Sequence, residues 1–254
     1  MEQYGKKIGA FAESLILLVV IALVWSISGS TGQINTVVMP SLGTVVETFC
    51  TDLVDGSLLL ALGISIRRVL LGYLISALLG IGLGIIIGLS VHMQRLTNLV
   101  IQILRPIPPI AWIPLVILWM GIGEGSKVFL IFLGGFFPVL INVTDGIRYT
   151  DKKLTEVAAV METPKLKYIT QLVIPAAMPS IFTGLRVSLG SCWTCVVAAE
   201  LVASTSGIGY MISNARNFGQ MDVVIVGMLA IGIVGKIMDV ILNSISRRVL
   251  AWNE

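Results

Sequence analysis

The chain has 254 residues, of which 56% are hydrophobic and 12% charged, and its mean hydropathy is +0.96. A soluble domain carries about 25% charged residues, so this composition argues against a water-soluble domain and favours a helical membrane protein. The net charge of +3, without a basic run interleaved with aromatic residues, gives no reason to expect nucleic-acid binding. Three cysteines, an odd number, do not make a disulfide framework.

Six segments have the composition expected of a transmembrane helix, which needs about 20 mostly apolar residues. In chain order they are Ser14–Ser28, Gly72–Val91, Leu96–Met120, Val128–Ile147, Met178–Ala203 and Val223–Ile245. The first is short, and its flanks also fit a secretory signal peptide. We predict that it is kept as an uncleaved span, because the charges farther along the chain require an N-terminus inside.

The distribution of Lys and Arg predicts the topology. With the N-terminus inside, ten basic residues lie on the cytoplasmic side and two outside, or four if Arg67 and Arg68 are counted there. This is a clear positive-inside bias. The ten are Lys6, Lys7, Arg95, Arg148, Lys152, Lys153, Lys165, Lys167, Arg247 and Arg248. Both termini are therefore predicted to be cytoplasmic.

Three features are expected around the second span. After Pro40, Ser41 is placed to cap an amphipathic helix in the first external loop. The apolar stretch 58–71 is predicted to extend the second span outward into one long helix. Gly80, Gly84 and Gly88, each four residues apart, form a smooth groove against which another helix can pack.

The third span contains the sequence Arg105-Pro-Ile-Pro-Pro-Ile-Ala-Trp-Ile-Pro114. Its prolines must interrupt the helical hydrogen bonds, and broken helices in membranes are tolerated inside protein or beside a water-filled cavity. Both a packed kink and a pathway lining fit this pattern, so Arg105, Pro108 and Trp112 are candidate pathway residues.

Several motifs resemble phosphate-binding, redox or metal sites but lack the residues or surroundings that such sites need. The stretch 121–127 has glycines and Lys127 but not the order that a phosphate-binding loop needs. Cys192 and Cys195 lie within a predicted span, where apolar surroundings make thiols inert. His92 is the single histidine, so no histidine-based metal site or catalytic triad is expected. We predict no catalytic residue and no metal ligand.

Ionisable residues inside spans are functional candidates by default, since each is costly to insert. They are Arg186, Glu200, Lys236 and Asp239. Lys236 and Asp239 stand three residues apart and can neutralise each other, whereas Arg186 lies near the inner end and can snorkel. Glu200, near the outer end of the fifth span, and Arg68 are added to the candidate pathway residues. No series of buried carboxylates indicates a proton relay.

The longest cytoplasmic segment, at about 148–177, is expected to carry the function. Leu154, Val157, Ala158 and Met161 follow helical spacing, and a second short helix should start at Pro164 and end at Pro175. A short helix with a narrow apolar face needs something to pack against, and its predicted position outside the membrane indicates a soluble partner. An interfacial hairpin that merely covers the bundle fits the pattern equally well.

Glu156-Val-Ala-Ala159 through Leu172-Val-Ile-Pro175 resembles the EAA motif of ABC importer permeases. Several further motifs resemble the nitrate/sulfonate/taurine subfamily, over about residues 40–250. They are Ser65-Ile-Arg-Arg68, Leu104-Arg-Pro-Ile-Pro108, Ile113-Pro-Leu, Leu118-Trp-Met-Gly-Ile-Gly-Glu124, Phe137-Pro138, Ala199-Glu-Leu-Val202 and Gly207-Ile-Gly-Tyr210.

The resemblance implies the all-α fold of a type I ABC importer permease. It also implies a single transmembrane domain over residues 1–254, with six transmembrane helices, located in the bacterial plasma (inner) membrane. The EAA loop is then the coupling segment that contacts the ATP-binding subunit. The residues that this assigns to coupling are Glu156, Val157, Ala158, Ala159, Met161, Glu162 and Pro175. Glu162 stands where the motif has Gly, so a positive φ there would be strained unless the loop turns elsewhere.

The resemblance also implies the partners. They are a second permease copy, two ATP-binding subunits that hold ATP and magnesium, an extracytoplasmic substrate-binding protein and membrane lipid. This chain itself is expected to hold no cofactor and to catalyse nothing. The implied cargo is a small anion such as an aliphatic sulfonate, taurine, nitrate or bicarbonate. Arg68 and Arg105 could supply positive potential along the route, although snorkelling explains them equally well.

Three alternatives stay open from the sequence alone. One is a permease of the same type for a thiamine precursor or another heterocycle. Another is a stand-alone secondary transporter or channel, against which the missing inverted repeat and missing carboxylate pairs count. The third is a membrane scaffold that only tethers a soluble enzyme through the loop.

Overall fold

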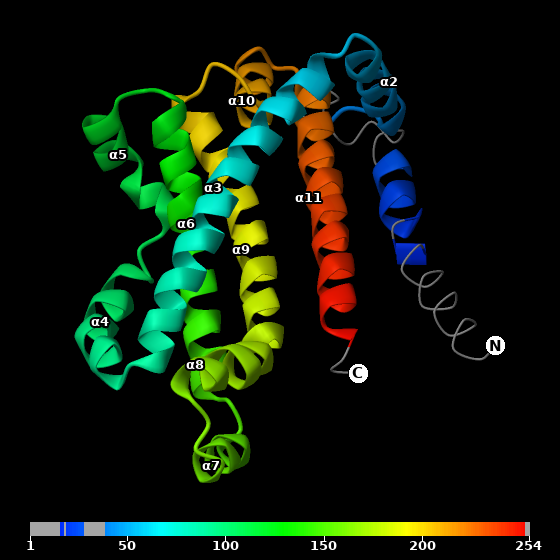
Figure 1. Cartoon of the computed structure of the whole chain (residues 1–254). Helices are drawn as coiled ribbons and strands as arrows, with labels where there is room; N and C mark the ends of the chain where they lie inside the picture. The colour runs from blue at the N-terminus through cyan, green and yellow to red at the C-terminus, as the bar shows by residue number, and fades with distance from the viewer. Residues whose placement is uncertain (1–15, 18, 28–38, 252–254) are drawn as a thin grey trace, which may run out of the picture. The chain divides into compact units, whose positions relative to one another are not determined.

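The computed structural model describes residues 16–17, 19–27 and 39–251, and throughout this part of the chain the regular elements are helices (Figure 1). In chain order they are α2 (Leu42–Val54), α3 (Ser57–Leu89), α4 (Val91–Leu104), η1 (Pro109–Trp112), α5 (Ile113–Met120), α6 (Glu124–Arg148), α7 (Lys152–Val160), α8 (Lys165–Lys167), η2 (Tyr168–Val173), α9 (Ile174–Ala203), α10 (Ile208–Asn217) and α11 (Met221–Val249).

The chain forms two compact units. One comprises residues 1–60 and 211–230, and the other comprises residues 61–210 and 231–254. In the described part of the first unit, Ser41 caps α2 by accepting a hydrogen bond from the Thr44 amide at 3.1 Å, as the sequence predicts. Thr48 on α2 donates to the Asp222 carboxylate at the start of α11 at 2.7 Å. The second unit contains the sites discussed below.

Four of the described helices are long and apolar enough to cross a membrane, or five if the bent pair formed by α4 and η1–α5 is one span. α3 has 33 residues and starts at Ser57, which confirms that the stretch 58–71 and the second span form one long helix. The predicted first span, Ser14–Ser28, begins and ends outside the described residues, and 19–27 are helical. Six spans and cytoplasmic termini therefore stay predictions.

Small residues on α3 allow it to pack closely against α6. A Cβ added at Gly80 or Gly84 would lie only 2.7–2.9 Å from the side chain of Val139 or Val143. The same register continues at Gly72 against Ile131 and Gly88 against Ile147, so α3 and α6 run parallel. The predicted glycine groove is confirmed, and its partner is α6 of the same chain.

α9 runs antiparallel to α6 and completes the core of the second unit. Gly135 faces Cys192 and Ser188 of α9 so closely that a Cβ there would lie 2.6 Å from both side chains. Cys192 donates to the Ile131 carbonyl at 3.5 Å, and both Cys192 and Cys195 are free and buried. The two cysteines therefore contribute to helix packing, as expected from their position in a predicted span.

The third predicted span is broken. α4 ends at Leu104, η1 and α5 follow after a short break, and the two parts are bent by 86°. The proline-rich sequence predicts this interruption within the segment Leu96–Met120, and the prediction is confirmed. The first part of the segment starts earlier, at Val91, where Ser90 caps α4. The bend occurs because prolines at 106, 108 and 109 remove successive backbone donors.

The expectation that a short helix ends at Pro175 is wrong. The chain is helical from Lys165 through η2, a stretch of π-helix, into α9, and Pro175 lies in the first turn of α9. A proline removes one hydrogen bond and collides with the carbonyl four residues earlier. The wider π turn just before Pro175 accommodates that collision without ending the helix.

α11 contributes to the second unit through residues 231–249. Trp193 of α9 donates from its indole nitrogen to the Met238 sulfur at 3.2 Å. Arg186 of α9 pairs with Asp239 at 2.9 Å, while Lys236 lies 3.7 Å from the same carboxylate. Arg186 is thus the nearer partner of Asp239, which the sequence alone had paired with Lys236.

Candidate transport pathway and coupling loop

Three hollows follow one another along α6 within the second unit, and two of them are also lined by α9. The first, about 210 Å³, lies near the Glu124 end of α6 and is lined by Pro108, Ile113, Leu130 and Thr194, among others. The middle cavity, about 290 Å³, shares Pro109 with it. A polar pocket of about 520 Å³ extends toward Arg148 and shares Arg105 with the middle cavity. They form a discontinuous route from one end of α6 to the other.

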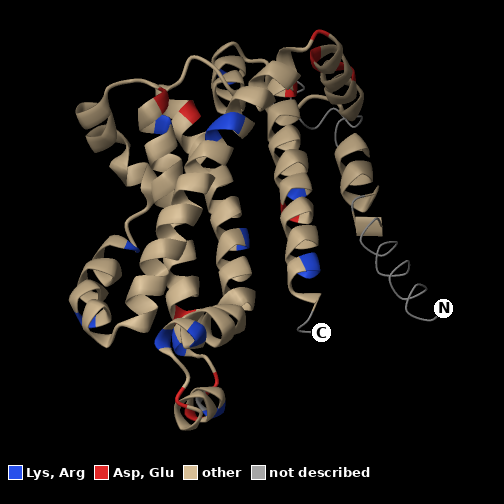
Figure 2. Cartoon of the chain, viewed as in Figure 1, with Lys and Arg blue, Asp and Glu red and all other residues tan. Residues whose placement is uncertain are grey.

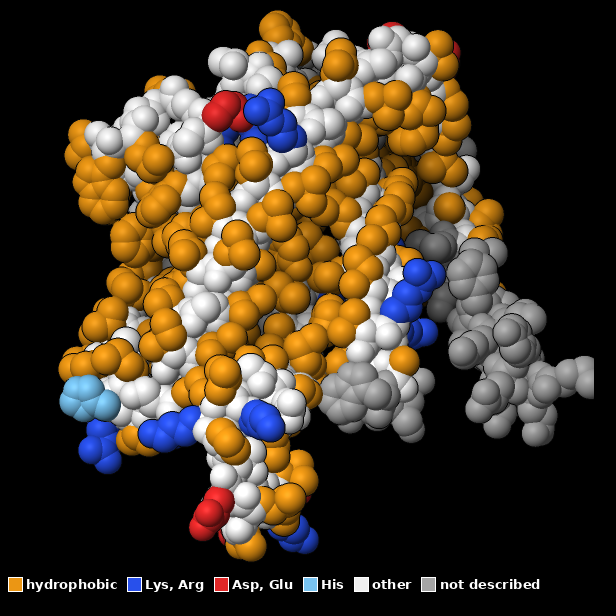
Figure 3. Space-filling view, viewed as in Figure 1, with side chains coloured by type: hydrophobic (Ala, Val, Ile, Leu, Met, Phe, Trp, Pro, Cys, Tyr) orange, Lys and Arg blue, Asp and Glu red, His pale blue; other side chains and the backbone are white. Residues whose placement is uncertain are grey.

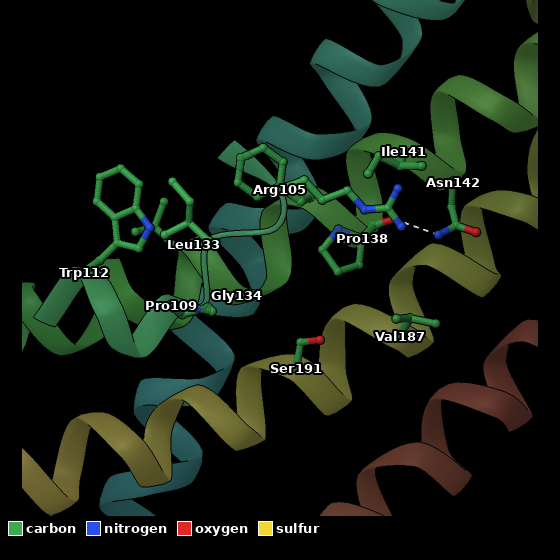
Figure 4. Close-up of a pocket in the computed structure, with 12 residues that line it drawn as sticks. Arg105, Pro109, Trp112, Leu133, Gly134, Pro138, Ile141, Asn142, Val187 and Ser191 are labelled. Carbon is green, nitrogen blue, oxygen red and sulfur yellow. Dashed lines mark hydrogen bonds between the residues drawn. The ribbon is translucent and has the colours of Figure 1, made fainter. Parts of the chain in front are cut away.

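The middle cavity lies beside the break between α4 and η1. Arg105 extends into it from the end of α4, and Trp112 lies on its other side (Figure 4). Asn142 and Ser191 contribute polar groups from α6 and α9. Asn142 donates to the Pro138 carbonyl at 2.8 Å, and Gly184 leaves room for it, since a Cβ there would lie 2.7 Å from Asn142 Cβ.

The polar pocket is lined by one face of α4. The lining residues Gln94, Thr97, Asn98, Ile101, Gln102 and Arg105 recur at helical spacing. Thr144, Asp145 and Arg148 of α6 lie opposite. A half-span with such a polar face is suited to line an aqueous route, because lipid would leave its amides unsatisfied.

A buried ionic network closes the Glu124 end of the unit. Arg68 of α3 donates to Glu200 of α9 at 2.7 Å and to Glu124 at 2.8 Å. Arg68 and Glu200 are 2% and 1% exposed. Lys127 pairs with Glu124 at 2.9 Å, so two positive charges face two negative ones.

The same network holds the turn that follows α9. Ser65 donates to Glu200 at 2.8 Å and accepts from the Ile208 amide at 2.9 Å. The Gly209 amide donates to Glu200 at 2.8 Å. Gly207 has a φ of +101°, and a Cβ there would collide with the Glu200 carboxylate. Arg68 and Glu200, which the sequence proposes for the pathway, are thus bound to each other and to this turn.

The predicted coupling loop projects beyond the ends of α6 and α9 (Figure 1). Asp151 caps α7 by accepting from the Lys153 amide at 2.9 Å. Hydrophobic side chains lie on its outer surface (Figure 3), with Val157, Val160 and Met161 all more than half exposed. Lys and Arg gather at the end of the unit where α7 and α8 lie (Figure 2). An exposed apolar patch of this kind typically marks a protein contact.

The other coupling residues fall on different sides of this loop. Glu156, Ala159 and Glu162 are exposed, whereas Pro175 is half-buried in α9. Ala158 is only 8% exposed, because it faces the second half of the loop across a small hollow lined also by Tyr168 and Leu172. A bulky residue at Ala158 would therefore push the two halves of the loop apart.

Glu162 has a left-handed backbone with a φ of +50°. The Glu162 amide donates to Ala159 and the Thr163 amide to Ala158, at 3.1 and 3.0 Å. This is the pair of hydrogen bonds of a Schellman motif, which usually places Gly at the left-handed position. The loop therefore keeps the turn that the motif's Gly would make. Because Glu162 occupies the left-handed position instead of Gly, the expected backbone strain is present.

Glu162→Gly should stabilise the end of α7. Removing the Cβ relieves about 1–2 kcal/mol of left-handed strain, less about 0.5–1 kcal/mol for the greater freedom of Gly in the open loop. Amide exchange in residues 152–163 should slow by roughly twofold to fivefold for a net gain of about 0.5–1 kcal/mol. Glu162→Ala keeps the Cβ and is the control, and equal protection in both variants would contradict this explanation.

The structure brings some of the sequence candidates together and separates others. Arg105 and Trp112 line the middle cavity, and Pro108 lines the neighbouring first hollow. Arg68 and Glu200 lie in the ionic network instead. Sequence reasoning missed Asn142 and Ser191, polar residues in otherwise apolar spans, and the polar face of α4, whose spacing was visible. Within the described residues, no group of three or more His, Cys, Asp or Glu is placed to bind a metal.

Residues 80–251, more than half of the chain, match the family described as "Binding-protein-dependent transport system inner membrane component". The chain belongs to this family. It is therefore the membrane permease of an ABC importer and is embedded in the inner membrane by several apolar helices. The family resemblance seen in the sequence is confirmed.

Three relatives illustrate the range of this similarity. A putative aliphatic sulfonates transport permease protein, SsuC, of Bacillus subtilis is 42% identical over 98% of this chain and 90% of the relative. The taurine transport system permease protein TauC of Escherichia coli is 33% identical over 94% and 89%. The nitrate import permease protein NrtB of Leptolyngbya laminosa is 32% identical over 97% and 90%.

Proposed function

We propose that this permease imports a small oxyanion, with aliphatic sulfonates as its main cargo and taurine and nitrate as the nearest competitors. The observation that carries the proposal is the middle cavity, into which Arg105 extends and which no carboxylate enters among the described residues that line it. A positive charge held beside a low-dielectric wall attracts anions. The names of the relatives support the same class of cargo.

We infer that two copies of this chain work together with two ATP-binding subunits and an extracytoplasmic binding protein. Each of the three hollows is partly open in a single copy, and a second copy would help to enclose them. ATP and magnesium would be held by the partner ATPase, which would pull on the loop at 148–177. Movement of this loop through the continuous helix Lys165–Ala203 would then open and close the route.

The test is reconstitution of the permease in liposomes with its ATPase and its binding protein. We expect ATP-dependent uptake of ethanesulfonate that requires both partners, and weaker uptake of taurine and nitrate. Uptake of a heterocycle such as a thiamine precursor, with no uptake of these anions, would contradict the cargo assignment. Uptake by the permease alone, driven by an ion gradient, would contradict the assembly.

A further inference from the structure

We propose that the middle cavity is a transient binding site for the anionic group of the cargo inside the membrane, with Arg105, Ser191 and Asn142 as its hydrogen-bond donors. The expected ligand is a small oxyanion with a short apolar tail, such as a C2 alkanesulfonate. This inference rests on the proposed function, because it assumes that cargo passes along α6 and α9. The cargo would then be recognised twice, first by the extracytoplasmic binding protein and again by this cavity in the permease.

The cavity presents side-chain donors that have no acceptor in the described part of the chain. The Arg105 guanidinium, which carries five N–H donors, has no hydrogen-bond or ion-pair partner among the described residues. The half-buried Ser191 hydroxyl has no partner there either. Asn142 uses one N–H on the Pro138 carbonyl and keeps the other. Such a set suits an anionic group with several oxygens, which accepts from several donors at once.

Arg105 is the C-cap residue of α4 at the break in the third span, and its exposed side chain lines both the middle cavity and the polar pocket. Its neighbours across the cavity, Pro138 and Val187, lie near the midpoints of α6 and α9. An unpaired arginine at that depth is costly in a membrane and marks a functional site by default. In contrast, the equally central Arg186 has a carboxylate partner in Asp239. The missing partner of Arg105 is therefore what distinguishes this position.

The remaining walls suit a short hydrocarbon chain. Leu133, Phe137, Ile141 and Val187 line the cavity, together with Trp112 (Figure 4). The volume of about 290 Å³ is at the lower end of the range of about 300–1,000 Å³ for small-molecule sites. Arg105 also lines the polar pocket, which contains one further positive and one negative side chain, Arg148 and Asp145.

The site can be tested by the charge preference of a thiol placed in it. The full reconstituted complex would carry Ser191→Cys in a Cys50→Ser background, because Cys50 is exposed whereas Cys192 and Cys195 are buried. The probes are the anionic sulfonatoethyl and cationic trimethylammonioethyl methanethiosulfonates, with rates normalised to those on 2-mercaptoethanol. We expect the anionic reagent to be favoured by about tenfold or more, as a focused positive potential implies, and ethanesulfonate to slow its reaction.

Arg105→Gln should remove this preference, and Arg95→Gln should keep it, since the exposed Arg95 on α4 lines none of these hollows. An unchanged preference in Arg105→Gln, or none in its parent, would overturn the proposal. If Ser191→Cys prevents assembly, Val187→Cys places the thiol on the same cavity wall and is measured in the same way.

Uptake gives a second readout in the same complex. Arg105→Gln should lower the maximal rate of ethanesulfonate uptake by about tenfold with little change in KM, because the binding protein captures the cargo first. Arg105→Lys should recover part of the rate, and an unaltered rate in Arg105→Gln would overturn the site. Absence of binding-protein-dependent anion uptake by the wild type would instead overturn the proposed function, whereas the labelling experiment would still report the charge preference of the cavity.

Discussion

Glu200→Ala should destabilise the permease by about 3–5 kcal/mol, the usual effect of removing one partner of a buried ion pair. Glu200 accepts hydrogen bonds from Arg68, Ser65 and the Gly209 amide. Its loss would leave the buried Gly209 amide without its acceptor, remove one of the two carboxylates that face Arg68, and release the turn after α9. The variant should show a strongly reduced yield of monodisperse protein in detergent.

Stability can be followed by reaction of a thiol-reactive dye with Cys192 and Cys195, which are buried until the bundle opens. In a Cys50→Ser background, Glu200→Ala should label at a much lower temperature than its parent. Glu124→Gln is the comparison variant, because the Glu124 side chain is 65% exposed, whereas Glu200 is buried, so the loss of Glu124 should lower stability less. Similar shifts in the two variants would refute the structural role of Glu200.

The second large effect is expected in the coupling loop. Val157→Asp places a charge in the exposed apolar surface formed by Val157, Val160 and Met161. If this surface contacts the ATPase, the change should weaken docking by about 2 kcal/mol or more, which is roughly 30-fold in affinity. ATP-driven uptake should fall accordingly, and the ATPase should no longer copurify with the permease.

Thr170→Asp is the control for this experiment, because Thr170 is an exposed residue in the other half of the loop. It should assemble and transport normally. Glu156→Lys, on the exposed side of α7, should also uncouple ATP hydrolysis from uptake, whereas Ala158→Trp should do so indirectly by separating the halves of the loop. Normal coupling in both Val157→Asp and Glu156→Lys would place the ATPase contact elsewhere.

Local patterns in the sequence predict much of this fold because they have local physical causes. The Ser41 cap depends on residues within one helical turn, and the break after Arg105 depends on prolines that lack a backbone donor. The strained turn at Glu162 is predicted by its departure from a glycine motif. The glycine groove on α3 is equally visible, although its partner α6 is not.

Pro175 shows where such reasoning fails. A proline removes a hydrogen bond locally, but whether the helix stops or widens depends on what packs around it. Val173 and Ala177, on either side of Pro175, are buried in the same core as Val139, Val143 and Ile147. The short π segment before Pro175 lets the helix continue while these side chains keep their contacts.

The charged residues of this chain are few and unevenly placed, because a membrane tolerates few charges and basic residues stay inside. From this pattern and its motifs, the sequence by itself predicted a membrane permease, which family membership confirms, and a coupling loop, which stays a prediction. Only the tertiary structure decided the roles of the individual charges. Arg68 meets Glu124 and Glu200 through contacts between distant segments, whereas Arg105 meets no acceptor in the described chain and extends into a cavity. Pairing across helices depends on their register and depth, and no local pattern encodes either.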